Sequence, residues 1–301
     1  MKILITGHNG FIGQNLMSYL ETKHEVAGYD FHPENLPLVK DYDWVIHLGA
    51  ISSTTETDVD KVILHNYEFS KWLFNQCNQY NVNMQYASSA SVYGNTKHFK
   101  EDGPSDPKSP YAAGKLFAHE MTKIYRESYD MFAVNGILFN HESPLRGETF
   151  VTRKISKAVG RISQGIQTKL TLGNLDAFRD WGFAGDYVKG MYLMMQHEQP
   201  DDWVLSSDET HSVKEFVKIA FDCVDLNWED YVVTSKKYER PNEVEHLLGD
   251  STKARTKLNW TPEVSFKELV EMMVDSDIKE AIREKVLLEQ NLIKPTWENP
   301  T

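Results

Sequence analysis

The chain has 301 residues, 41% of them hydrophobic, which suits one large α/β unit or a nucleotide-binding domain joined to a smaller domain. Its formal net charge of −12 argues against nucleic acid as a general partner. The sequence has no apolar run of about 18 residues and no signal-peptide pattern at its start, so neither a membrane span nor export is expected, and we predict a cytoplasmic protein.

The first half of the chain alternates short apolar strands with segments of helical periodicity. Strands are predicted at residues 2–6, 25–29, 43–48, 84–88 and 131–139, and helices at residues 11–20, 59–80 and 111–129. This alternation predicts an α/β fold with a doubly wound parallel sheet.

The segment after Asp30 is unusually short. Only 12 residues, numbers 31–42, separate it from the strand that begins at residue 43, and two of them are prolines. A full doubly wound sheet usually places a helix and a third strand there. We therefore predict a sheet trimmed after its second strand, with a thinner adenine pocket.

The alternation loosens after residue 140. Helices are predicted at residues 151–163, 186–196, 213–223, 251–258 and 266–275, and a strand at residues 203–205 is expected to rejoin the sheet. We expect a first domain made of residues 1–139 plus about 181–205. The rest, residues 140–180 plus 206–301, is expected to form a smaller, discontinuous C-terminal domain.

Gly7, Gly10 and Gly13 form a GxxGxxG turn between the first strand and the first helix. Glycines let the backbone approach a pyrophosphate, which the N–H groups at the helix N-terminus attract. Asp30 ends the next strand, where it suits the ribose hydroxyls of NAD and repels the 2′-phosphate of NADP. The pattern predicts a Rossmann domain that binds NAD, with NADP as the alternative because Lys40 could approach. The predicted cofactor-binding residues are Gly7, Asn9, Gly10, Phe11, Ile12, Gly13, Asp30, Leu48, Ala50, Tyr111 and Lys115.

Tyr111 and Lys115 form a YxxxK motif where the helix at residues 111–129 begins. The i, i+4 spacing puts the phenol and the ammonium group on one helix face. A free phenol has a pKa of about 10, and a fixed neighbouring cation favours the phenolate. Tyr111 could then take or return the proton of a substrate hydroxyl during hydride transfer to or from a nicotinamide.

A cluster of hydroxyl groups ends the strand before this motif, in the string YASSASVYG at residues 86–94. The glycine turn, the serine cluster and the YxxxK motif follow one another in the order expected of a Ser-Tyr-Lys catalytic set. The serine would hydrogen-bond the reacting hydroxyl. We assign this role to Ser89, with Ser88 as the rival.

At these motifs the chain resembles the extended short-chain dehydrogenase/reductases of the NAD-dependent epimerase/dehydratase family. The strings HLGA (47–50), SSTTE (52–56), NYEFSK (66–71) and YASSASVYG resemble ADP-glycero-manno-heptose 6-epimerase. Residues 133–156, 172–196 and 240–260 resemble GDP-mannose 4,6-dehydratase. The resemblance implies a nucleotide-sugar substrate, most simply a GDP-sugar, bound by the second domain.

The second resemblance also implies roles for single residues. Asn140 would contact the diphosphate-sugar, Lys154 the guanine base and Glu243 the ribose. Arg179 and Arg240 would hold the diphosphate, whose oxygens match a guanidinium fork.

One position departs from the dehydratase pattern. A 4,6-dehydratase oxidises C4 of the sugar, and a base then removes the C5 proton so that water leaves from C6. The resembled dehydratases have a Glu for this, two residues before the YG pair, where this chain has Ser91. A serine hydroxyl is a weak base, so we place Ser91 among the substrate-binding residues and predict hydride transfer at C4 without elimination.

Several interpretations of the activity follow from Ser91. A 4-epimerase, a 4-dehydrogenase or a 4-keto reductase would need no further base. GDP-mannose 4,6-dehydratase is the alternative, with Glu142 as a substitute carboxylate, although His141 and Glu142 are expected rather to satisfy buried hydrogen bonds. A non-catalytic NAD-binding scaffold is the alternative from another class.

The resembled enzymes pair through two helices per subunit. The segments at residues 59–80 and 111–129 carry apolar residues on more than one face, as a second buried stripe would require, so we predict a homodimer or a tetramer. Cys77 and Cys223 lie far apart without a CxxC context, which predicts buried free thiols and no metal site.

Overall fold

The computed structural model of the chain describes residues 1–52, 56, 58–95, 99–238 and 246–297. The chain forms two compact units, each assembled from separate segments. The first unit comprises Met1–His141, Ala184–Glu209 and Leu248–Glu263, and the second comprises Glu142–Phe183, Thr210–Leu247 and Val264–Thr301.

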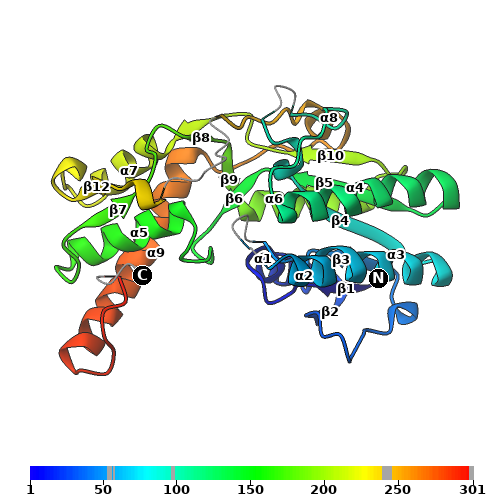
Figure 1. Cartoon of the computed structure of the whole chain (residues 1–301), viewed down its shortest axis with the longest axis horizontal. Helices are drawn as coiled ribbons and strands as arrows, with labels where there is room; N and C mark the ends of the chain where they lie inside the picture. Colours follow the sequence, from blue (N-terminus) through cyan, green and yellow to red (C-terminus); the bar gives the residue numbers. More distant parts are fainter. Residues whose placement is uncertain (53–55, 57, 96–98, 239–245, 298–301) are drawn as a thin grey trace. The chain divides into compact units, whose positions relative to one another are not determined.

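The first unit is built on a six-stranded sheet whose strand pairs are all parallel. In spatial order the strands are β10 (Asp202–Leu205), β5 (Ala133–Leu138), β4 (Asn83–Ser89), β3 (Trp44–His47), β1 (Lys2–Thr6) and β2 (Glu25–Tyr29) (Figure 1). Their side chains are almost wholly buried in the interior strands, as expected of strands covered on both faces. The predicted doubly wound fold is confirmed, including the return of the strand near residue 203.

The sheet stops at β2, which is an edge strand. Residues 30–43, all of them described, contain the short 3-10 turn Val39–Asp41 and no strand. The predicted trimming of the sheet after its second strand is therefore confirmed.

Helices cover the two faces of the sheet. Helix α1 (Phe11–Leu20) packs against α6 (Ala184–Gln196), and α3 (Phe69–Tyr80) packs against α4 (Pro110–Tyr129). The segment predicted as one helix at residues 59–80 is continuous but not uniform. It begins as α2 (Val59–Val62), passes through the π-helical turn η2 (Ile63–Glu68) and continues as α3. Such π turns often lie at functional sites.

Residues 248–263, with helix α8 (Thr252–Lys257), belong to the first unit, whereas the sequence prediction placed all of residues 206–301 in the second domain. Trp260 explains this placement. Its indole Nε1 donates a hydrogen bond to the Asp186 carbonyl on α6 (2.8 Å), and its ring meets Tyr187 edge-on. A buried tryptophan with a satisfied N–H fixes the segment to α6.

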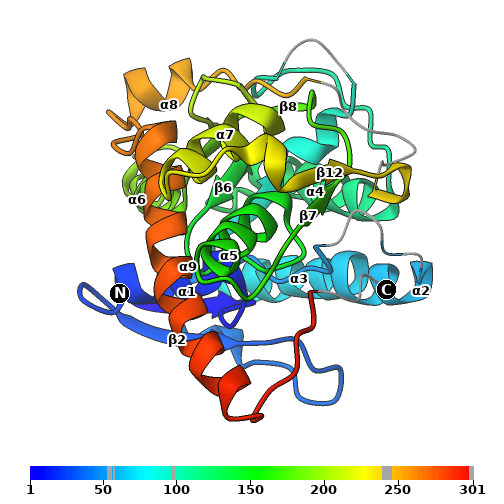
Figure 2. The same ribbon diagram turned by 90° about the vertical axis from the view of Figure 1, so that its left-hand side faces the viewer.

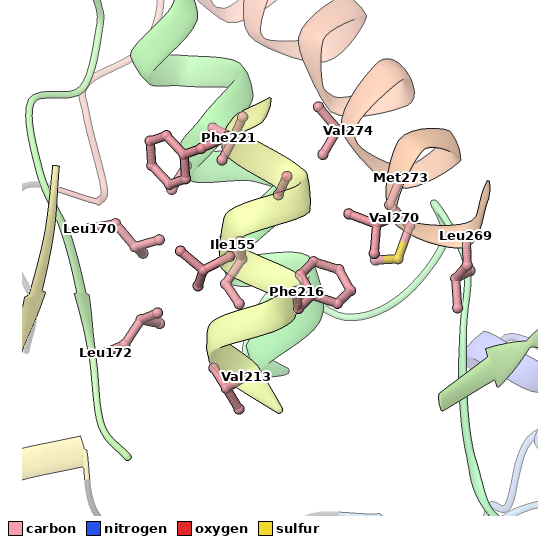
Figure 3. Close-up of a cluster of buried hydrophobic side chains, with 14 of the residues drawn as sticks. Ile155, Leu170, Leu172, Val213, Phe216, Phe221, Leu269, Val270, Met273 and Val274 are labelled. Atoms are coloured by element: carbon pink, nitrogen blue, oxygen red, sulfur yellow. The ribbon is translucent and has the colours of Figure 1, made fainter. Parts of the chain in front are cut away.

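The second unit is built around three helices, α5 (Val151–Ser163), α7 (Val213–Asp222) and α9 (Phe266–Glu289). Its core brings Ile155, Phe216 and Val270 together from these helices (Figure 3). Its short strands are β7 (Leu170–Leu172), β8 (Phe178–Arg179), β9 (Trp181–Phe183), β11 (His211–Ser212) and β12 (Val232–Thr234). Strand β6 (Asn140–Glu142) has only its last residue in this unit.

Helix α9 extends well beyond the predicted end at residue 275. It runs alongside α5 (Figure 2), and ion pairs between the two helices continue along the added turns. Arg153 reaches Asp277 (2.8 Å), and Arg161 forms a fork with Glu284 (2.7 Å to each oxygen). These acidic residues after residue 275 therefore pair with buried arginines of α5 and do not mark the end of the helix.

Both cysteines are free thiols, and their burial differs. Cys77 is buried, as predicted, but Cys223 is exposed, because the end of α7 leaves its side chain outside the core. Every helix in the described part of the chain is too short or too polar to cross a bilayer. Among the described residues no three His, Cys, Asp or Glu side chains gather as ligands for a metal ion.

Candidate active site

The glycine turn joins β1 to α1 in the conformation that a dinucleotide fold requires. Gly7 has a φ of +76°, and its N–H donates to the Tyr29 carbonyl on β2 (2.7 Å). A Cβ atom at Gly7 would lie 2.7 Å from the Gly49 backbone, and one at Gly13 would lie 2.2 Å from the Gly7 carbonyl oxygen. Any side chain at Gly7 or Gly13 would therefore clash with the backbone of the turn.

The start of α1 is open to an anion. Gly10 is the N-cap residue, and no side chain of the described residues caps the helix there. The first N–H groups of a helix carry a partial positive charge and bind phosphate oxygens. The glycine turn thus fits the pyrophosphate of a dinucleotide, with Phe11, Ile12 and Gly13 forming the first turn of the helix.

Asp30 lies just beyond β2, where its carboxylate is partly exposed. It accepts a hydrogen bond from the Asn9 amide and stands 3.6 Å from Nδ1 of His8. Both partners come from the glycine turn, so the turn and the predicted ribose-binding acid are held together. Leu48 and Ala50 follow β3, next to Gly49 and the glycine turn.

Lys115 is buried in the second turn of α4, with a side chain that reaches the serine strand. Its Nζ donates to the Ala87 carbonyl on β4 (2.8 Å) and lies 4.9 Å from the centre of the Tyr86 ring. Burial lowers the pKa of Lys115 from its usual 10.5 to about 7. The ammonium group can therefore release and regain a proton near neutral pH.

Tyr111 lies one helical turn before Lys115, in the first turn of α4. Ser109 caps this helix by accepting a hydrogen bond from the Ala112 N–H (3.1 Å), and Pro110 is suited to the first helical position. The cap fixes where the helix begins and hence where Tyr111 lies in its first turn. Helix α4 packs on β4 and on the turn that follows it.

The two candidate serines have different environments. Ser88 is buried, and its hydroxyl is bonded to Nδ1 of His119 (3.1 Å), a residue of α4. Ser89 is half-buried at the end of β4, where its Oγ accepts from both the N–H (3.2 Å) and the Oγ (2.9 Å) of Ser91. Because successive strand residues point to opposite faces, only one of the pair can serve the site, and Ser89 is the less enclosed.

Of the residues predicted to bind the sugar, Asn140 lies in the first unit, half-buried at the start of β6. The next residue, His141, stacks on Phe11 of the glycine turn (5.6 Å between ring centres, 11° between planes). Its Nδ1 bonds to the Phe139 carbonyl (2.8 Å). His141 thus supports the glycine turn from β6.

The second unit holds two further described candidates, Lys154 and Arg179. Lys154 on α5 donates to the Thr171 carbonyl (2.7 Å) and lies 4.0 Å from the centre of the Tyr238 ring, and burial lowers its pKa. Arg179 on β8 donates to the Phe178 carbonyl (2.7 Å). Arg240 and Glu243 lie outside the described residues, so the predicted set of two arginines and an acid is only partly placed.

Glu142 takes the structural role that the sequence favoured. It is buried, accepts from the Thr152 hydroxyl (2.7 Å) and pairs with Arg146 (3.1 Å) in the second unit. Burial raises its pKa, and Arg146 and Thr152 partly offset this. A carboxylate with these partners is already satisfied, which weakens its case as a substitute base.

Two buried histidines, His47 and His119, had no predicted role. His119 is hydrogen-bonded to Ser88, and its Nε2 lies 3.9 Å from the Asp202 carboxylate. Burial lowers the pKa of His119 to about 4. His47 lies between Thr6 and Ser70 at the end of β3. Its signal in the sequence was a single polar side chain at the end of the apolar run WVIH, but its partners are distant in the chain.

Comparison with known proteins relates the chain to one family. The sequence model described as GDP-mannose 4,6 dehydratase matches residues 36–273. GDP-mannose 4,6 dehydratase 1 of Arabidopsis thaliana is 56% identical over 202 residues, and GDP-mannose 4,6 dehydratase of Homo sapiens is 46% identical over 217 residues. These alignments cover 67% and 66% of this chain but only 56% and 58% of the relatives, so the chain spans little more than half of their length.

Solved structures show the same fold at lower identity. The structure described as RMD from Pseudomonas aeruginosa complexed with NADPH has a TM-score of 0.82 at 21% identity, covering 93% of this chain and 99% of that one. The UDP-glucose 4-epimerase of Thermus thermophilus in complex with NAD has a TM-score of 0.78 at 24% identity, covering 92% and 99%. These likenesses confirm the predicted fold class.

Proposed function

The chain belongs to the GDP-mannose 4,6-dehydratase family, and we propose that it is an NAD(P)-dependent enzyme that acts on a GDP-linked sugar, with dehydration of GDP-mannose as the first candidate reaction. The family relation supports the substrate class. The buried Lys115, one turn after Tyr111 and bonded to the serine strand, is the observation that carries the chemistry.

The first unit supplies the dinucleotide site of this proposal. The glycine turn, the uncapped start of α1 and Asp30 form a cradle that a Cβ at Gly7 or Gly13 would fill. When bound, the nicotinamide accepts and returns a hydride. Asp30 favours NAD, since its charge opposes a 2′-phosphate. NADP is the alternative, and the solved relatives have been captured with either dinucleotide.

Proton transfer at the sugar falls to the residues of α4 and β4. The Tyr111 phenolate takes the proton of the C4 hydroxyl as the C–H bond at C4 breaks. The Lys115 ammonium group favours this phenolate. Ser89 donates a hydrogen bond to the reacting oxygen. The bond between Ala87 and Lys115 holds the ammonium group in place during this exchange.

The second unit supplies the candidate nucleotide contacts. Lys154 would bind the guanine base, and Arg179 the diphosphate, with Arg240 and Glu243 completing the set. Asn140 and Ser91 of the first unit would contact the sugar. We accordingly assign dinucleotide binding to the first unit and nucleotide-sugar binding to the second.

The choice between dehydration and simple hydride transfer depends on position 91. The sequence alone favoured hydride transfer at C4 without elimination, whereas the family relation favours the dehydratase. Hydride transfer is kept as the second candidate for one reason: Ser91 donates to Ser89 where the resembled dehydratases have a base.

Product mass separates the two candidates. Wild-type protein would be incubated with GDP-mannose and either NAD or NADP, and the nucleotide sugar analysed by mass spectrometry. The dehydratase predicts a product lighter by one water. An isomer of unchanged mass would overturn dehydration and establish 4-epimerisation. A product lighter by two hydrogens, with matching reduction of the dinucleotide, would indicate a 4-dehydrogenase.

We also propose that the chain forms at least a dimer through the helices at residues 59–80 and α4. Four apolar side chains on these helices are exposed, namely Val59, Ile63, Leu64 and Ile124. Monomers seldom leave such a group in water without a partner.

Light scattering should report at least twice the chain mass for the wild type and a monomer for the double variant Ile63→Asp/Leu64→Asp. Leu38→Asp, which changes a more exposed leucine elsewhere, should leave the mass unchanged; a monomeric wild type at micromolar concentration would refute the proposal.

A further inference from the structure

A buried chain of hydrogen bonds links the glycine turn to the segment after β3. Thr6, the last residue before Gly7, bonds through Oγ1 to Nδ1 of His47 (2.7 Å). Nε2 of His47 bonds to the Ser70 hydroxyl (2.9 Å), and this hydroxyl donates to the Asn66 carbonyl (2.8 Å). All four residues are at most 1% exposed.

The far end of this chain clamps a backbone segment. The Asn66 side chain accepts from the Ile51 N–H (2.8 Å) and donates to the Ile51 carbonyl (3.2 Å). Asn66 lies in the π-helical turn η2, a geometry that re-aims side chains relative to a regular helix. Ile51 directly follows Leu48, Gly49 and Ala50, so the clamp holds the segment next to the glycine turn.

The direction of each bond follows from counting hydrogens. A serine hydroxyl has one proton, and Ser70 gives it to the Asn66 carbonyl. Ser70 must therefore accept from His47, which makes Nε2 the protonated ring nitrogen. Nδ1 is then unprotonated and accepts a hydrogen bond from the Thr6 hydroxyl. Burial lowers the pKa of His47 to about 3, which agrees with a neutral ring.

The ring of His47 is also held sterically. Phe69 meets it edge-on (5.4 Å between centres, 90° between planes), and Tyr86 packs at 5.5 Å. Beside it, the backbones of Gly7 and Gly49 approach so closely that a Cβ at Gly7 would lie 2.7 Å from Gly49. The glycines permit this approach, and the hydrogen-bonded chain sets its spacing.

We propose that Thr6, His47, Ser70 and Asn66 are positioning residues that fix the glycine turn relative to the segment at residues 48–51, and so preorganise the chain for its dinucleotide. The inference rests on the proposed function in that it takes the glycine turn to be the dinucleotide site. None of the four residues needs to touch the ligand. They act by keeping two backbone segments at the separation that the ligand requires, which lowers the cost of ordering them on binding.

A matched pair of variants tests the first link. Thr6→Val keeps the side-chain shape and removes the proton that His47 accepts, whereas Thr6→Ser keeps the hydroxyl and loses a methyl group. Thr6→Val should weaken dinucleotide binding, measured by calorimetry, by about tenfold, the effect of leaving one buried polar group unpaired. Thr6→Ser should bind within about threefold of the wild type.

The coupling between the ends is the sharper test. Ser70→Ala should also weaken binding and should speed hydrogen exchange at the Ile51 amide in the chain without ligand. Because both changes interrupt one chain of bonds, the double variant Thr6→Val/Ser70→Ala should lose less affinity than the two single losses combined. Ser156→Ala, which removes another buried hydroxyl from the second unit, controls for general loss of stability and should leave the affinity unchanged.

The failures can be told apart. A wild type that binds neither NAD nor NADP would overturn the proposed function. A wild type that binds, with Thr6→Val and Ser70→Ala equally tight or with independent losses, would overturn the positioning role and leave the proposed function standing.

Discussion

Replacing Tyr111 with phenylalanine is expected to lower kcat for GDP-mannose by about 10²–10⁴-fold, the usual contribution of a positioned acid–base group. The variant keeps the ring and loses only the hydroxyl that exchanges the sugar proton. The glycine turn and Asp30 are unchanged, so the affinity for the dinucleotide should stay within about twofold of the wild type. Steady-state kinetics and calorimetric titration together measure both quantities.

Tyr129→Phe is the matched control for this change. Tyr129 ends the same helix, is exposed and takes no part in the proposed reaction, so its variant should turn over at the wild-type rate. If Tyr111→Phe retained full turnover while the wild type was active, Tyr111 would not be the catalytic base.

Replacing Lys115 with methionine is expected to lower kcat by a similar factor, because the phenolate of Tyr111 loses the cation that favours it. The same change should raise the free energy of unfolding. Lys115 is a buried ammonium group whose charge must be desolvated on folding, and methionine fills the space without a charge.

The stability effect has a defined pH dependence. Burial lowers the folded-state pKa of Lys115 to about 7, whereas an unfolded lysine titrates near about 10.4. Between these values the unfolded chain holds the extra proton, so the penalty of burying Lys115 is full below about pH 7 and fades as the pH rises towards about 10.4. The unfolding free energy of the variant minus that of the wild type should therefore be larger at about pH 6 than at about pH 9.

Denaturant titrations at both pH values would measure this difference. Lys267→Met, which changes an exposed lysine of α9, should give the same small difference at both. A Lys115→Met effect that did not change with pH, or one that grew towards alkaline pH, would contradict a buried lysine with a lowered pKa.

Local patterns explain why much of the fold could be predicted and why candidate reacting groups could be named. The glycine turn, the YxxxK motif and the serine strand each depend on spacing within a few residues, and those spacings fix which side chains share a turn or a face. The trimmed sheet followed from the same kind of count, since residues 31–42 are too few for a helix and a strand. The structure has an edge strand at β2 in that place.

Long-range pairing explains what was missed. His47 is separated from Thr6 by 41 positions and from Ser70 by 23, so the sequence showed one polar residue in an apolar strand and none of its partners. The later turns of α9 were missed for the same reason. Their acids resemble a solvated surface until α5 places Arg153 and Arg161 against them.

We propose that this chain binds a nicotinamide dinucleotide and uses Tyr111 and Lys115 to transform a GDP-linked sugar. The most direct measurement is the consumption of GDP-mannose by wild-type protein with NAD or NADP, followed by mass spectrometry beside the Tyr111→Phe variant. Wild-type protein should convert GDP-mannose to a product lighter by one water, and the variant should convert it at least about 10²-fold more slowly. Unchanged GDP-mannose with both dinucleotides, or equal conversion by the variant, would contradict this proposal.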